Sequence, residues 1–139
     1  MKKWIVVLLI AALMPLTLAA CGGKSNSPAA GSTDITVQLS EFMFDPAAVT
    51  VPAGKQITLT LFNAGSVEHS WVLLKKGYTY TTPYDADDEA NTLQTFVVQA
   101  GETKTFTFTS PADPGDYQVV CHVVGHAEAG MVGKLSVVP

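Results

Sequence analysis

Apolar side chains recur at every second position along most of the chain beyond Asp34. The alternation covers positions 35–39, 49–51, 57–61, 71–73, 106–108, 117–121 and 135–137. A period of two is typical of strands that bury one face, and the enrichment in Val, Thr and Phe agrees with that interpretation. Turn-forming Gly, Pro and Asn residues separate these segments at hairpin-like spacings. The pattern therefore predicts an all-β sandwich.

The segment 75–92 does not follow this pattern. It is rich in Tyr, Thr, Asp and Glu and contains Pro83. It is either a long surface excursion or a segment with one short helix within 85–91. Loops of this length are uncommon in compact domains unless they are functional or mobile.

The N-terminal residues resemble an export signal. Lys2 and Lys3 precede an uncharged apolar run, and Leu18, Ala19, Ala20 and Cys21 resemble a bacterial lipoprotein cleavage box, in which the cysteine is lipidated. An ordinary secretory signal and an uncleaved membrane anchor are the alternatives. We expect a signal peptide over 1–20, a flexible Gly- and Ser-rich tether over 21–33 that carries lipidated Cys21, and one folded domain over 34–139.

Charge and cysteine content narrow the possible functions. Charged residues make up 14% of the chain, arginine is absent, and loss of residues 1–20 with their two lysines changes the net charge from -4 to -6. A nucleic-acid partner is therefore not expected, because phosphate binding needs a clustered basic face. If Cys21 is acylated, Cys121 has no partner for a disulfide. A lone thiol outside the cytoplasm is protected from oxidation when it binds a metal.

Four residues form a candidate metal-binding set. Cys121, His126 and Met131 are spaced five residues apart, and His69 follows the turn at 63–65. Two imidazoles, one thiolate and one thioether suit copper that cycles between Cu(I) and Cu(II). Zinc is the rival metal, but structural zinc sites use Cys, His and carboxylates rather than Met. Taken singly, each of these residues is more often structural.

Two further residues resemble metal ligands but are assigned other roles. His122 follows Cys121 directly, so strand alternation points it to the opposite face. Met43 lies between Phe42 and Phe44 and is expected to pack in the core.

The ligand segments resemble those of a known family. The run from Cys121 to Lys134 is similar to the ligand loop of small cupredoxins, with a plastocyanin-like second half, and the run from Glu68 to Leu73 resembles the first-histidine strand of auracyanins. This resemblance implies a Greek-key β-sandwich of about eight strands. It also implies one copper per chain, bound by His69, Cys121, His126 and Met131. Ser70 replaces the family's Asn, and Val120 replaces plastocyanin's Tyr.

The expected function is electron transfer between redox protein partners by a monomer anchored through lipid to the outer face of a bacterial cytoplasmic membrane. An enzyme is not expected, because a trinuclear copper cluster needs more histidines than the three present. Copper storage or delivery and a plain adhesion module are the alternatives. We expect His126 to be the electron port, within an apolar patch of Val123, Val124, Ala127, Ala129 and Val132. An acidic group is expected to steer partners: Asp85, Asp87, Asp88 and Glu89.

Overall fold

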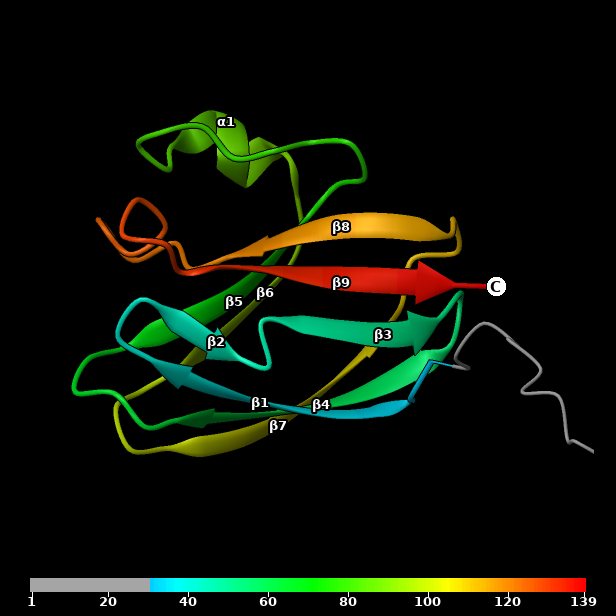
Figure 1. Ribbon diagram of the computed structural model, residues 1–139, viewed down its shortest axis with the longest axis horizontal. Coiled ribbons are helices and arrows are strands. Elements are labelled where there is room, and N and C mark those ends of the chain that lie inside the picture. Colours follow the sequence, from blue (N-terminus) through cyan, green and yellow to red (C-terminus); the bar gives the residue numbers. More distant parts are fainter. Residues whose placement is uncertain (1–30) are drawn as a thin grey trace, which may run out of the picture.

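The computed structural model describes residues 31–139, which form nine strands and one short helix (Figure 1). The strands are β1 (Asp34–Ser40), β2 (Met43–Asp45), β3 (Ala48–Pro52), β4 (Gln56–Asn63), β5 (His69–Leu74), β6 (Thr92–Val98), β7 (Thr103–Thr109), β8 (Gly115–Val120) and β9 (Val132–Val138), and the helix is α1 (Ala86–Ala90). The hydrophobic pattern did not indicate β2 and β6. The first is only three residues long, and the second directly follows the irregular segment 75–91.

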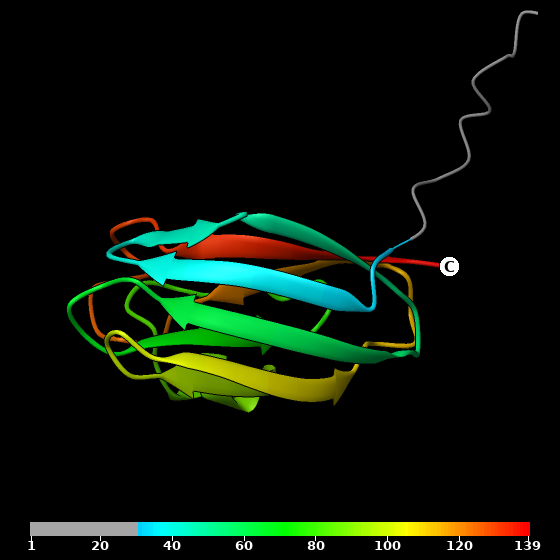
Figure 2. The same cartoon turned by 90° about the horizontal axis from the view of Figure 1, so that it is seen from below.

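The strands form two sheets that pack face to face. One sheet has the order β2-β1-β4-β7 and the other β3-β9-β8-β5-β6. Pairing is antiparallel except for β1 with β4 and β3 with β9, which are parallel. Figure 2 shows β1, β4 and β7 side by side in one layer, with β3 and β9 in the other. The predicted all-β sandwich is confirmed.

The main core lies between the two sheets and extends to the metal-binding residues. In β1, Ile35, Val37 and Leu39 point inward, as the alternation predicted, and their polar neighbours face solvent. Cys121 and Met131 belong to the same buried cluster. The thiol and the thioether are therefore positioned by core packing, which is dense and resists small shifts.

Strand β5 is buried on both faces, because the segment between β5 and β6 covers its outer side. All six of its residues are buried. Val72 and Leu74 contact Tyr78, Tyr80 and Tyr84 of the covering segment in a second apolar cluster. Both sequence hypotheses for this segment apply, since it is a long excursion that contains α1, capped by Asp85.

The chain enters the domain at the end opposite to the candidate metal site. In Figure 1, β1 begins near the C-terminus, whereas the loop after β8 and the turn before β5 lie at the other end. The predicted signal segment, the tether and Cys21 lie outside the described residues. Within residues 31–139 no helix has the length and apolar character needed to cross a bilayer.

Candidate metal centre

Neighbouring strands bring the predicted ligands together. His69 is the first residue of β5, and Cys121 directly follows β8, which pairs with β5 in antiparallel register through Val72 and Val120. Cys121 is free and fully buried. His126 lies in the loop that connects β8 to β9, and Met131 ends that loop. The sandwich thus places residues 52 positions apart in the chain within one small volume.

Three donor atoms face one another in this volume. The Nδ1 atoms of His69 and His126 are 3.1 Å apart, and the Sγ of Cys121 lies 3.6 Å from Nδ1 of His126 and 4.0 Å from Nδ1 of His69. All three residues are buried. Electron-pair donors that converge in a dry space repel one another unless a cation lies between them. The arrangement therefore fits a metal ion bound through Sγ and two Nδ1 atoms.

Met131 closes the same loop from the core side. Its side chain is fully buried. Its backbone carbonyl accepts a hydrogen bond from the amide of Cys121 at 3.1 Å, and its amide donates to the carbonyl of His126 at 2.9 Å. These bonds tie the three residues of the loop into one turn. A thioether donor is soft and weak, which suits copper rather than zinc.

Burial prepares His69 to bind a metal. Desolvation lowers the pKa of His69, and the electrostatic interaction with His126 lowers it further, whereas the carboxylate of Glu41 acts in the opposite direction. A lowered pKa keeps the imidazole neutral near pH 7, with a free electron pair on one ring nitrogen. The Nε2 atom of His69 is buried and has no hydrogen-bond partner among the described residues. Nδ1 is therefore the nitrogen that faces the other donors.

Ser70 links the two ligand segments despite replacing the family's Asn. Its backbone amide donates to Sγ of Cys121 at 3.4 Å, and its hydroxyl lies 3.6 Å from the same sulfur. The hydroxyl also accepts a hydrogen bond from the amide of His122 at 2.9 Å. Donors directed at the sulfur stabilise a thiolate and fix its position. The substitution keeps a polar bridge between the β5 strand and the cysteine loop.

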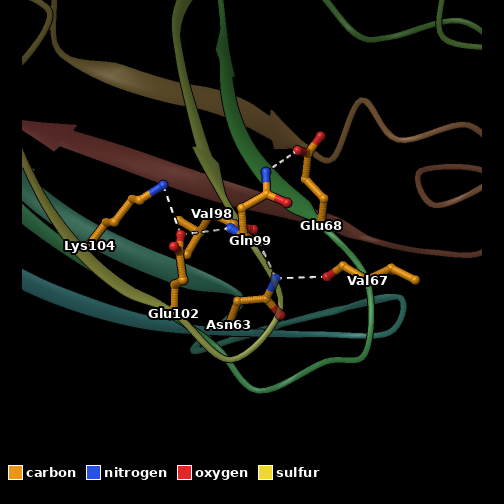
Figure 3. Close-up of polar contacts among 7 residues, drawn as sticks. All are labelled: Asn63, Val67, Glu68, Val98, Gln99, Glu102 and Lys104. Atoms are coloured by element: carbon orange, nitrogen blue, oxygen red, sulfur yellow. Dashed lines mark hydrogen bonds and ion pairs between the residues drawn. The ribbon is translucent and has the colours of Figure 1, made fainter.

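Hydrogen bonds of the Asn63 side chain fix the turn that precedes His69. The buried amide of Asn63 donates to the carbonyls of Val67 and Val98 (Figure 3), and its oxygen accepts from the amide of Gly65. Gly65 packs directly against the imidazole, since a Cβ built there would lie 2.6 Å from Nε2 of His69. Sequence reasoning recognised this turn but not its contact with the ligand. The Asn-Ala-Gly signature is the only signal that could have indicated it.

The excursion between β5 and β6 supports the ligand loop from outside. The hydroxyl of Tyr80 donates to the carbonyl of Ala127 at 3.0 Å, and the amide of Tyr84 donates to the carboxylate of Glu128 at 3.1 Å. The two acceptors belong to the first and second residues after His126. This support could not be predicted from the sequence, because it depends on how the excursion folds back over the sheet.

Predictions about exposure are confirmed only in part. His126 is the more exposed of the two imidazoles, at 8% against 0% for His69, and Phe42 from the turn between β1 and β2 packs edge-on against its ring at 5.4 Å. Ala127, predicted to line a surface patch, is buried beneath the tyrosines of the excursion. Met43, predicted to lie in the core, is 52% exposed. The cause is the alternation within β2, in which Phe44 takes the inward position and its neighbours face solvent.

The acidic group is also smaller than predicted. Asp88 is fully buried and accepts hydrogen bonds from the hydroxyl of Tyr78 and from the amides of Thr81 and Asp85. It therefore stabilises the excursion and does not present a charge to a partner. Asp85, Asp87 and Glu89 remain exposed.

The fold and the donor set define a class of protein, the type 1 copper proteins. A Greek-key sandwich that holds two imidazole nitrogens, a cysteine sulfur and a methionine at one end matches the chemistry of a mononuclear blue-copper centre.

Comparisons with known proteins agree with this class. The sequence profile described as copper binding proteins, plastocyanin/azurin family, matches residues 31–138. Auracyanin-A of Chloroflexus aurantiacus is 31% identical, over 94% of each chain. The copper-resistant cuproprotein CopI of Rubrivivax gelatinosus is 29% identical, over 83% of this chain and 72% of that protein. The crystal structure of reduced auracyanin from Roseiflexus castenholzii superposes with a TM-score of 0.65 at 29% identity, covering 78% of this chain and 99% of that one.

The chain belongs to the plastocyanin/azurin family of copper-binding proteins. It is a blue-copper protein of the cupredoxin fold with a single type 1 site formed by His69, Cys121, His126 and Met131. The family consists of electron carriers rather than enzymes.

Proposed function

We propose that this protein carries single electrons between redox protein partners at the outer face of a bacterial cytoplasmic membrane. The observation that carries the proposal is the buried triangle of Sγ and two Nδ1 atoms, with edges of 3.1 to 4.0 Å. Copper bound there would supply the Cu(I)/Cu(II) couple. The chain's own part is to keep the donors fixed, so that a change of oxidation state requires little rearrangement.

Rigidity comes from three sides of the site. Ser70 binds the cysteine sulfur from β5, Asn63 locks the turn before His69, and Tyr80 holds the loop beside His126. None of these contacts uses a long, exposed side chain that solvent could compete for. The donors are therefore preorganised, as electron transfer requires.

An apolar surface beside the site is suited to transient docking. Phe42, Met43, Val67 and Val124 are exposed, with Val124 at 94%, and all belong to loops or strand ends that lie at the same end as the ligand loop (Figure 1). Weak redox encounters need only a small interface. Val124→Lys should slow electron transfer to the natural partner and leave the blue band unchanged. An unchanged rate would place docking elsewhere.

The test of the function itself is copper titration of the metal-free protein. The wild type should develop an intense blue thiolate band at one copper per chain. Cys121→Ser should stay folded but colourless, because a hydroxyl keeps the size and loses the soft donor. Retention of the blue band in this variant would contradict the assignment of Cys121.

Copper storage or delivery is the second candidate, favoured by the similarity to a copper-resistant cuproprotein. Storage requires metal to enter and leave easily. Here Cys121 and Met131 are fully buried, which favours a retained copper. Slow release of Cu(I) to a chelator would support the carrier, whereas fast and complete release would support delivery.

We propose that the protein acts as a monomer and is anchored through lipid at Cys21. The entry of the chain at the end opposite to the ligand loop supports this proposal, because an anchor there would leave the copper end free for partners (Figure 1). Cys21→Ala should release the protein from membranes. Unchanged membrane retention would favour an uncleaved helix instead.

A further inference from the structure

The carboxylate of Glu41 is fixed beside the copper site without being a ligand. Glu41 lies in the turn between β1 and β2, and its Oε1 accepts hydrogen bonds from the amide and from the hydroxyl of Ser66, the latter at 2.8 Å. These bonds lower the pKa of Glu41 to about 2, although the side chain is exposed. The carboxylate is therefore charged at any physiological pH and held in one place.

Gly65 lies beside both the carboxylate and the buried edge of His69. A Cβ built on Gly65 would be 2.6 Å from Nε2 of His69 and 2.9 Å from Oε1 of Glu41. The absence of a side chain at this position lets the negative charge and the ring edge approach the same point of the backbone.

The edge of His69 that faces Gly65 has no other polar contact. Nε2 is buried and unpaired among the described residues, while Nδ1 faces His126 and Cys121. When Nδ1 binds a metal, Nε2 must carry the proton, and a buried N–H without an acceptor is costly. A nearby negative charge reduces this cost, and it does so more strongly when the metal carries an additional positive charge.

We propose that Glu41 is a positioning residue of the copper centre, whose fixed charge stabilises the Nε2–H form of His69 and favours bound Cu(II) over bound Cu(I). This inference rests on the proposed function, because it concerns the balance between the two oxidation states. Glu41 is a neighbour of the ligands only in space, since it lies 28 positions before His69 in the sequence.

The test compares the affinities of the purified full-length protein for Cu(I) and for Cu(II). Metal-free wild type, Glu41→Gln and Glu41→Ala are titrated with Cu(I) and with Cu(II) against competing chelators. Glutamine keeps an oxygen that can accept from Ser66 and removes only the charge, whereas alanine removes both. Thermal unfolding of the metal-free proteins shows whether each variant is folded.

Glu68→Gln is the matched control. Glu68 precedes His69 directly, but its carboxylate accepts a hydrogen bond from the side chain of Gln99 (Figure 3) rather than from the turn beside Gly65. A general loss of negative charge near the site would affect both glutamine variants alike.

We expect Glu41→Gln to lower the affinity for Cu(II) relative to Cu(I) by roughly two- to fivefold, in the range of an exposed charge interaction, and the effect should shrink at high salt. Glu68→Gln should leave the ratio unchanged. Equal shifts in the two glutamine variants would overturn the proposal. So would a shift in Glu41→Ala without one in Glu41→Gln, because Glu41 would then only hold the turn. A wild type that binds no copper would instead overturn the proposed function and this inference with it.

Discussion

Gly65→Ala tests whether the copper site depends on the close packing of the 63–68 turn against His69. The added Cβ would lie 2.6 Å from Nε2 and 3.1 Å from Cδ2 of the imidazole, whereas ordinary contacts begin at 3.4 Å. The methyl group and the ring therefore overlap by about 0.8 Å. One of the two must move.

Movement of either the turn or the imidazole ring costs folding free energy. The side-chain amide of Asn63 holds the turn, since it donates hydrogen bonds to the carbonyls of Val67 and Val98 (Figure 3) and accepts one from the amide of Gly65. The ring of His69 is fully buried. Overpacking of this kind costs about 1–3 kcal/mol of folding free energy. A displaced ring also misaligns Nδ1, and disturbing the residues that orient a metal ligand lowers metal affinity by about 10–100-fold.

The assay measures copper affinity by chelator competition and stability by urea unfolding of the metal-free protein. Gly77→Ala is the control, because Gly77 has a positive φ of 76° and open space around it. It should lose about 1–2 kcal/mol through backbone strain and keep its copper affinity. If Gly65→Ala matched this control in both measurements, the turn would be compliant and the argument from rigid packing would fail.

Two further predictions concern the axial ligand and the excursion. Met131→Leu conserves volume, so the folding free energy should fall by less than about 1.5 kcal/mol. The reduction potential, measured by spectroelectrochemistry, should rise, since a thioether donor mainly stabilises Cu(II). Complete loss of copper binding would show that Met131 has a larger role. Asp88→Ala leaves the buried donors of Tyr78, Thr81 and Asp85 without their acceptor. It should cost about 2–4 kcal/mol and expose 77–91 to proteolysis while the protein stays blue; resistance equal to wild type would contradict this role for Asp88.

The ligand set could be predicted from sequence because its geometry is mostly local. Cys121, His126 and Met131 lie on one short loop after a strand whose alternation is unambiguous, with Tyr117 and Val119 buried on the same side as the cysteine. Only His69 had to come from elsewhere, and a turn followed by an apolar strand marked its position. The alternation of side chains along the strand, with a period of two residues, thus determined which side chains point inward.

The surroundings of the site could not be predicted in the same way, because they depend on contacts between distant segments. The apolar run 71–74 of β5 is compatible with burial on both faces, but what covers its outer face depends on the path of the excursion. Burial of Asp88 has the same origin. A carboxylate in an acidic, polar segment is normally exposed, and only three converging donors make its burial tolerable.

The shielding of His126 at the copper end depends on one backbone exception. Phe42 has a φ of 63°, which is rare for a bulky residue and costs about 1–3 kcal/mol, so it persists only where packing enforces it. The Glu41–Ser66 contacts hold the turn on one side, and the edge-on contact with His126 holds the ring on the other. The ring of Phe42 is 48% exposed, against 8% for His126. The ring of Phe42 therefore shields the imidazole of His126 from solvent at this end of the molecule.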